Sequence, residues 1–457
     1  MIRKGSEPGR WSTSFAFYLA SAGAAVGLGS IWRFPYLTGA NGGSAFVFIF
    51  ILACLAIATP LLIAEFIIGR RSRRSPPEAA GEVARSFGRS RRWNIIGILG
   101  TVATFLIMSY YTVIAGWVLA YTWKCSSGQL TGLTRPEIAL HFHEFLSDPL
   151  RVGAWHLAFI ILVGGISARG VNRGIELANK IRAPGLLILL LILVAYALTA
   201  GDASRGLTFA FAPDFSKLSA NVVLAAIGQA FYATGVGMAM MLAYGAYVPL
   251  GTSLVRSALI ISCSIVAVSL LSTVMIFPLV YQYGLNPAQG ADLVFNVLPT
   301  AFAEMPGGRL IGTLFFLLLV FAALTPSLAG IEPIVAWLEQ HRGLSRSKAS
   351  FLAAAGVWVL GVGSVLSFNV WARWHPLAGI GRLQSMTVFD ALDFISSNLL
   401  LPVGALLTCV FVGWRLPPSL GDSELPEETV ATRRMVRLLL RYVCPAAIAA
   451  VLVAAFV

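Results

Sequence analysis

The sequence predicts an all-α integral membrane protein of about eleven transmembrane helices, one for each apolar segment long enough to cross a bilayer. Three observations predict this class. First, 57% of the 457 residues are hydrophobic and only 12% are charged, with a mean hydropathy of +0.80. Second, apolar segments of about 20 residues, each able to span roughly 30 Å of hydrocarbon, recur along the chain. Third, two of these segments hold glycine clusters that an ordinary spanning helix does not need.

The predicted spans belong to one membrane domain. They lie at about 12–36, 44–69, 93–123, 154–169, 183–200, 221–247, 255–283, 308–338, 349–369, 387–413 and 435–456. Spans one and six contain the glycine clusters and stand five apart, which favours two five-helix repeats of inverted topology. We therefore divide the chain into a cytoplasmic N-terminus (1–11), a first repeat (12–200), a second repeat (201–415), and an inner loop with the eleventh helix (416–457).

Basic residues gather in alternate loops and set the orientation. They are Arg70, Arg71, Arg73, Arg74, Arg85, Arg89, Arg91 and Arg92 after span two, Arg169, Arg173, Lys180 and Arg182 around the next such loop, and Arg342, Arg346 and Lys348 after span eight. Because positive loops stay inside, these loops and the N-terminus are predicted to be cytoplasmic. The net charge of +13 then reflects topology in a plasma membrane, and nucleic acid is not expected as a partner.

The stretch from Gly23 to Pro35 interrupts the first span. Gly23, Gly27 and Gly29 fall within seven residues, although each glycine costs about 1 kcal/mol in a helix interior relative to alanine. One interpretation is close helix packing through the Gly23 and Gly27 pair. The other is that the helix unwinds, so that its freed backbone groups bind small ions and zwitterions. A second interruption, from Gly228 to Met238 in span six, favours unwinding.

Several polar residues lie inside the spans, where they are costly. Arg33 and Asp393, at similar depth in spans one and ten, either form an outer gate or reach the interface separately. Glu65, deep in span two, is expected to bond freed backbone. Thr325 and Pro326 in span eight either free carbonyl groups for a ligand or simply kink the helix.

The sequence contains no nucleophile–base pair, no metal-ligand spacing of His, Cys and Asp, and no phosphate-binding loop, so an enzyme is not expected. A small molecule and the lipid bilayer are the expected partners. The predicted outer connection 284–307 contains an apolar stretch, 293–298, that is too short to span. This stretch is either a hairpin that dips toward a vestibule or an ordinary surface loop.

The motifs resemble those of the neurotransmitter:sodium symporter family. In chain order they are Trp11, the Gly23–Pro35 break with Tyr36, Asn41-Gly42-Gly43, Glu65–Arg70, Tyr110-Tyr111, Gly228–Phe231, Phe321–Thr325, Glu332-Pro333 and Leu392-Asp393-Phe394. They extend from about residue 11 to 415. The resemblance implies the leucine-transporter fold, alternating access, and a bacterial inner-membrane importer that couples an amino acid to sodium.

The resemblance also implies where the substrate binds. The amides of Leu28 and Gly29 and the hydroxyl of Tyr111 would hold a carboxylate, and carbonyls near Ala25, Tyr232 and Gly235 would receive an amine. Further substrate contacts would come from Ile107, Met238 and Gly330. Gly27 stands where monoamine-transporting members have an aspartate, so the substrate is expected to bring its own carboxylate.

The sodium sites that the resemblance implies are only partly kept. The second site would use the carbonyls of Gly23, Val26 and Ala322 and the hydroxyl of Thr325, but Pro326 replaces a serine. The first site would use Ala25, Ser30 and Ser264; Ser30 and Ser264 stand for asparagines, and Ala233 replaces a hydroxyl residue. Coupling to one sodium, coupling to protons, uncoupled transport, and a sensor that binds without transport all remain open.

An inner gate is expected at the cytoplasmic end of the chain. Pro8 and Gln340 stand where the family has an arginine and an aspartate. The neighbouring Arg10 and Glu339 are therefore expected to form the gate. Neither chloride dependence nor the oligomeric state follows from these residues.

Overall fold

The computed structural model describes residues 11, 13–249, 251–286, 293–379 and 383–455, and within these ranges the chain is helical without any β-strand. Nine helices in this part of the chain are long and apolar enough to cross a membrane. They are Ser44–Ser72, Arg91–Ser126, Pro149–Ala168, Arg173–Ala200, Leu254–Gln282, Gly308–Arg342, Arg346–Leu366, Val388–Arg415 and Val430–Ala454. A tenth span is the pair Ser14–Ala25 and Gly29–Ala40, bent by 52° at its break.

The remaining predicted span, the sixth, is also broken. Its apolar first part ends at Thr234 and a short helix resumes at Met240. The helices of the spans are α1 (Ser14–Ala25), α2 (Phe34–Ala40), α3 (Ser44–Ala53), α4 (Thr59–Ser72), α6 (Ile95–Ser126), α8 (Pro149–Ala168), α9 (Leu177–Ala200), α11 (Ala220–Thr234), α12 (Met240–Ala246), α13 (Leu254–Gln282), α15 (Gly308–Arg342), α16 (Arg346–Leu366), α17 (Val388–Asp393), α18 (Leu401–Val410), α20 (Val430–Leu438) and α21 (Cys444–Ala454).

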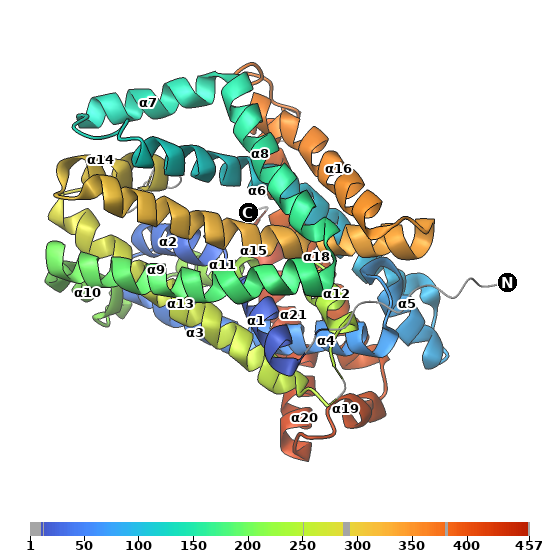
Figure 1. Ribbon diagram of the computed structural model, residues 1–457. Coiled ribbons are helices and arrows are strands. Elements are labelled where there is room, and N and C mark those ends of the chain that lie inside the picture. The colour runs from blue at the N-terminus through green and yellow to red at the C-terminus, as the bar shows by residue number, and fades with distance from the viewer. Residues whose placement is uncertain (1–10, 12, 250, 287–292, 380–382, 456–457) are drawn as a thin grey trace.

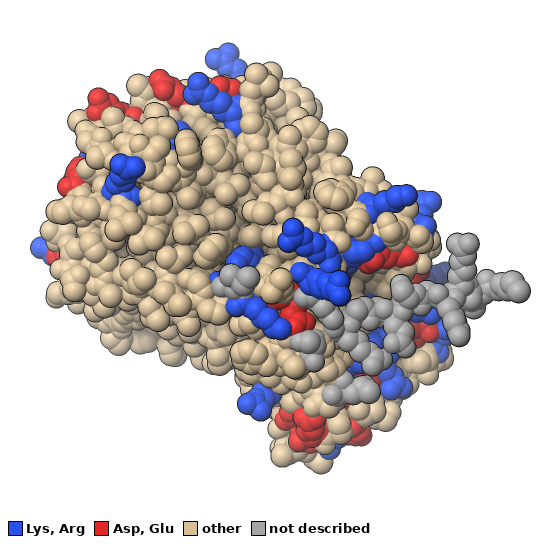
Figure 2. Space-filling model, in the orientation of Figure 1, with Lys and Arg blue, Asp and Glu red and all other residues tan. Residues whose placement is uncertain are grey.

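Short helices cap the bundle at its two ends (Figure 1). α5 (Pro76–Ser86) and α19 (Pro418–Glu424) lie at one end, which we call the α5 end. α7 (Arg135–Ser147), α10 (Ala203–Phe211) and α14 (Leu298–Glu304) lie at the opposite, α7 end. Figure 2 shows charged side chains gathered toward these ends, with a broad uncharged band between them, as expected for a membrane-spanning bundle.

Both glycine clusters break their helices, as the unwinding interpretation predicts. α1 stops at Ala25 because Val26 is extended, with φ −80° and ψ 98°. α11 stops at Thr234, and Gly235, Gly237 and Ala239 then take positive φ values of 66°, 83° and 56°. Left-handed backbone is inexpensive for glycine, which explains two of these three positions.

The first break also packs closely against α15, so both interpretations of its glycines hold. A Cβ placed on Gly23 would lie 2.9 Å from Thr325 Cγ2, and one placed on Gly27 would lie 2.5 Å from Pro326 Cγ. Real Cβ atoms do not come this close to other groups. Only glycine therefore allows α1 and α15 to approach to this distance.

The apolar stretch at the α7 end is buried, which excludes an ordinary surface loop. Leu293–Val297 forms a π-helical turn that continues into α14. Phe295 is fully buried and its ring packs against those of Trp117, Tyr121 and Phe142. The stretch therefore packs into the bundle at its α7 end.

Candidate substrate and ion sites

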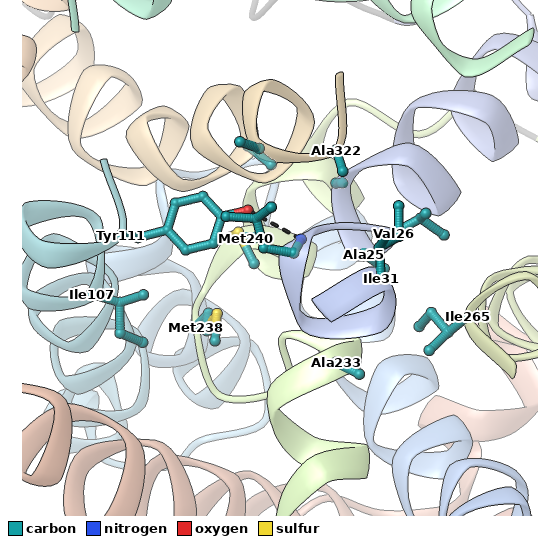
Figure 3. Packing of buried hydrophobic residues seen from close by; sticks show 14 of the residues in the cluster. Ala25, Val26, Ile31, Ile107, Tyr111, Ala233, Met238, Met240, Ile265 and Ala322 are labelled. Carbon is teal, nitrogen blue, oxygen red and sulfur yellow. Dashed lines mark hydrogen bonds between the residues drawn. The ribbon is translucent and has the colours of Figure 1, made fainter. Parts of the chain in front are cut away.

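A small internal cavity lies between the two breaks (Figure 3). Its lining comes from the first break (Ala24, Ala25, Gly27, Gly29), from α6 (Ile107, Met108, Tyr111), from the second break and its flanks (Tyr232, Ala233, Gly235, Met238, Met240) and from α15 (Pro326). The cavity volume is about 30 Å³, enough for a few water molecules at most, since one needs roughly 10–15 Å³ on this measure. The cavity is thus nearly closed in this conformation.

The polar part of the cavity is the start of the π-helical turn at Gly29. The amide nitrogen of Leu28 donates to the hydroxyl oxygen of Tyr111 at 3.4 Å. Among the described residues, no backbone acceptor faces the amides of Gly27 and Gly29. One hydroxyl and these N–H groups therefore converge at a helix N-terminus, an arrangement that favours an anionic group.

Most of the predicted substrate residues line this cavity. Ala25, Gly29, Ile107, Tyr111, Tyr232, Gly235 and Met238 do so directly. Leu28 adjoins it through its amide. Gly330 lies one layer behind, since a Cβ placed on it would be 2.6 Å from the sulfur of Met108.

The sequence reasoning missed two methionines that fill the cavity. Met108 occupies the space in front of Gly330, and the methyl group of Met240 would lie 2.6 Å from a Cβ on Gly235. The 3.6-residue period of α6 could have indicated Met108, which is one turn before Tyr111. Met240 follows an unwound segment, so no helical period predicts where it points.

The predicted second ion site lies where α1 meets α15. Pro326 has no N–H group, so the carbonyl of Ala322 loses its intrahelical donor. This oxygen lies 3.5 Å from the position of a Cβ on Gly27. The Thr325 hydroxyl donates to Phe321 O at 2.9 Å and so keeps its lone pairs free. No backbone donor in the described chain reaches the carbonyls of Gly23 and Val26, so the oxygen set fits a small cation.

The structure does not bring the predicted first ion site together. Ser30 is buried and its hydroxyl has no partner within the described residues. Ser264 instead lies on a half-exposed face of α13, and its hydroxyl donates to Ile260 of the same helix. Ile265, on the buried face of α13, lies toward Ala233 in Figure 3. Polar groups also border Ser30, since Ser272 donates to Ser30 O at 2.8 Å and Gln229 donates to Gly29 O at 2.7 Å. Ser264, however, is not among them.

The predicted outer gate is not a direct ion pair in this conformation. The Arg33 guanidinium stacks over the Tyr232 ring at 4.1 Å. Asp393 accepts hydrogen bonds from Tyr110 at 2.8 Å and Ser397 at 2.9 Å. Tyr232 also lines the cavity. Its ring therefore separates the cavity from Arg33.

At the α5 end, Glu339 bonds Arg346 at 3.2 Å, while Arg10 lies outside the described residues. Arg346 also makes a two-pronged contact with the fully buried Glu332, at 2.6 and 2.8 Å. This network was not predicted from the sequence. The sequence feature that could have indicated this network is the acidic Glu332 within span eight, followed by the basic Arg346 just after the next turn.

Trp11 closes the same end of the bundle. Its ring packs edge-on against Tyr244 with centroids 5.1 Å apart, and its amide donates to Tyr247 O. Tyr247 in turn donates to Glu332 at 2.9 Å. Trp11 is thereby joined to the α12 half of the broken span six.

The expectation that Glu65 bonds a backbone group freed by a helix break is confirmed. Its carboxylate accepts a hydrogen bond from Gly237 N at 2.7 Å. Thr104 of α6 also donates to the carbonyl of the adjacent Met238. These two side chains satisfy backbone groups that the second break leaves unpaired, and so hold its shape.

Two broken helices that enclose a closed polar site in mid-bundle define a class of protein, the helical membrane transporters. Comparisons with known proteins agree. The profile of the sodium:neurotransmitter symporter family matches residues 8–134 and 137–457. The sodium-dependent transporter YhdH of Bacillus subtilis is 37% identical over 423 residues, covering 92% of this chain and 90% of that protein. A sodium-dependent transporter of Haemophilus influenzae is 34% identical over 414 residues, covering 89% of each.

The crystal structure of MhsT in complex with L-phenylalanine superimposes with a TM-score of 0.89 and 37% sequence identity. It covers 98% of this chain and 100% of MhsT. The chain therefore belongs to the sodium:neurotransmitter symporter family, whose members here are sodium-dependent transporters.

Proposed function

We propose that the protein imports a zwitterionic amino acid by sodium-coupled symport with alternating access. The observation that carries this proposal is the Leu28 amide facing the Tyr111 hydroxyl at 3.4 Å, at the start of a helical segment. These donors suit a substrate carboxylate. The free carbonyl of Ala25 suits the ammonium group of the same molecule. The carbonyls of Tyr232 and Gly235 each accept one backbone bond, from Gly235 N and Met238 N, and offer a second lone pair.

The side-chain part of the cavity favours an apolar substrate. Met108, Met238 and Met240 line it, and methionine is flexible enough to move aside when another apolar group enters. MhsT, which was crystallised with L-phenylalanine, has a similar fold. We therefore expect an amino acid with a large apolar side chain to displace these methionines.

Sodium would enter as the coupling substrate at the second site. Gly23, Val26, Ala322 and Thr325 supply oxygen atoms there, whereas the Ser264 hydroxyl expected at the first site bonds Ile260 of its own helix. A single sodium per cycle is therefore the stoichiometry that we propose. Proton-coupled or uncoupled transport would not require this set of oxygens.

The α5 end would face the cytoplasm, because its loops carry most of the arginines. Arg33, Tyr232 and Asp393 then cover the site from outside, and Trp11 and the Arg346 network close it from inside. Movement of the first repeat (12–200) against the second (201–415) would open one cover at a time. The protein would lie in the bacterial inner membrane.

The test is thermal stabilisation of the purified protein by a panel of amino acids, each in sodium and in choline. A ligand that binds only the folded state at 100 times its Kd stabilises it by about 2.7 kcal/mol. We expect large apolar amino acids to stabilise in sodium only. Equal stabilisation in choline would remove sodium coupling, and ligand binding without flux into vesicles would indicate a sensor.

Replacing Tyr111 by phenylalanine tests the carboxylate assignment. The change removes one hydroxyl from a buried position and leaves the ring in place. A hydrogen bond to a charged group contributes about 1.5–3 kcal/mol, so affinity should fall about 10- to 100-fold. Tyr121→Phe is the matched control, since Tyr121 is also buried on α6 and its hydroxyl has no partner in the described chain. Unchanged affinity in Tyr111→Phe would contradict the assignment.

A further inference from the structure

Arg182 is a buried cation without a counter-ion. Only 6% of its surface is exposed. Its Nη2 donates to Asn179 Oδ1 at 2.6 Å and its Nε to Ala178 O at 3.2 Å, while Nη1 has no partner. Within the described chain no carboxylate comes within ion-pair distance of it. A buried charge left unpaired is costly, so its position requires an explanation.

Two packing contacts place Arg182 beside the second ion site. Asn179 Oδ1, which Arg182 holds, lies 3.8 Å from the position of a Cβ on Gly23. The guanidinium Nη2 is therefore no more than 6.4 Å from that position, since 2.6 Å and 3.8 Å are the two steps between them. Gly23 contributes one of the four oxygens of the site.

The second packing contact is made by Gly185, one helical turn after Arg182 in α9. A Cβ on Gly185 would be 3.1 Å from the ring of Phe321. α9 ends and α15 begins at the α7 end, so the two helices run in opposite directions (Figure 1). One turn back from Gly185 is Arg182, and one turn on from Phe321 is Thr325. Arg182 and the Thr325 hydroxyl are thus at the same depth in the bundle.

We propose that Arg182 is a tethered cation that competes with sodium for the second ion site. This inference rests on the proposed sodium coupling at that site. Gly23, Val26 and Ala322 leave carbonyl oxygens unpaired there, and these are the acceptors that the free Nη1 lacks. When the guanidinium satisfies them, sodium has to displace it, which weakens sodium binding and favours sodium release.

The competition has a definite sign and size. Two like charges about 7 Å apart at an effective dielectric constant of about 20 repel enough to change an affinity by about 10- to 100-fold. Removing the charge of Arg182 should therefore lower the sodium concentration for half-maximal effect by that factor. It should also make ligand binding depend more strongly on sodium, because nothing then replaces the ion.

The test measures the sodium midpoint for thermal stabilisation, in choline-balanced salt, with and without the best amino acid of the panel. The variants are Arg182→Gln and Arg182→Met, with Arg182→Lys to keep the charge. Arg173→Gln is the control, because Arg173 is an exposed arginine at the α5 end of the same span. We expect both neutral variants to shift the midpoint downward, Arg182→Lys to shift it less, and Arg173→Gln to leave it unchanged.

The outcomes separate this inference from the proposed function. If the unaltered protein responds to sodium and the neutral variants have the same midpoint, the competition is wrong and sodium coupling stands. A lowered melting temperature without a midpoint shift also overturns it, since that is the effect of a purely structural arginine. If neither the protein nor any variant responds to sodium, the proposed coupling fails, and this inference fails with it.

Discussion

Replacing Gly27 by alanine is expected to abolish substrate binding at ordinary concentrations. The added Cβ would lie 2.5 Å from Pro326 Cγ, 3.2 Å from the Tyr111 hydroxyl and 3.5 Å from Ala322 O. A proline ring cannot rotate away, so α1 has to move off α15. Such overpacking costs about 1–3 kcal/mol. The shift also separates the Leu28 amide from Tyr111 and the carbonyls of the first break from Ala322.

We expect affinity for the best amino acid of the panel to fall about 100-fold or more, because one added methyl group disturbs the substrate and ion sites together. Gly228→Ala is the matched control, since a Cβ there meets nothing within 4 Å. Alanine within a helix should leave binding unchanged and add slight stability. If Gly27→Ala binds the amino acid as tightly as the unaltered protein does, α1 and α15 can separate without loss of binding. That result would contradict the proposed placement of the substrate and sodium between these helices.

The second large effect is expected from Arg346→Met at the α5 end. Glu332 is fully buried and receives two guanidinium bonds from Arg346, at 2.6 and 2.8 Å. Removing one partner of a buried pair leaves an uncompensated charge and typically costs about 3–5 kcal/mol. The purified variant should unfold at a clearly lower temperature, and the double change Arg346→Met with Glu332→Gln should recover part of the loss.

The exposed pair of Arg135 and Glu304 provides the control. Its atoms are 3.2 Å apart, but the two side chains are 52% and 40% exposed. Solvent screening makes such pairs weak, so Arg135→Met should barely change the melting temperature. Equal effects of the two methionine variants would contradict a stabilising role for the buried contact between Arg346 and Glu332.

Several features of the fold could be predicted because they depend on short stretches of sequence. Apolar segment length places the spans, and glycine clusters place the two breaks. The bond from Gly237 to Glu65 was also anticipated, because a buried carboxylate needs donors and a broken helix provides them.

Side-chain partners were harder to predict, because they depend on the rotation and depth of whole helices. A shift of one residue in span seven exchanges Ser264 for Ile265, which face different sides of α13. Arg33 and Asp393 were predicted to lie at a similar depth, yet Arg33 stacks on Tyr232 and Asp393 bonds Tyr110. Opposite charges at a similar predicted depth in different helices need not form an ion pair, because each can instead contact a nearby aromatic residue.

Most of the cavity lining was identified through the resemblance to a known family. The sequence by itself determined the membrane class, the order of the spans and the two broken helices. These follow from hydropathy and local backbone cost, which act within one segment. Only the tertiary structure decided that Met108 and Met240 fill the cavity, that Arg346 binds Glu332, and that Arg182 lies beside Gly23 and Thr325. Such contacts arise from how helices far apart in the chain rotate and pack.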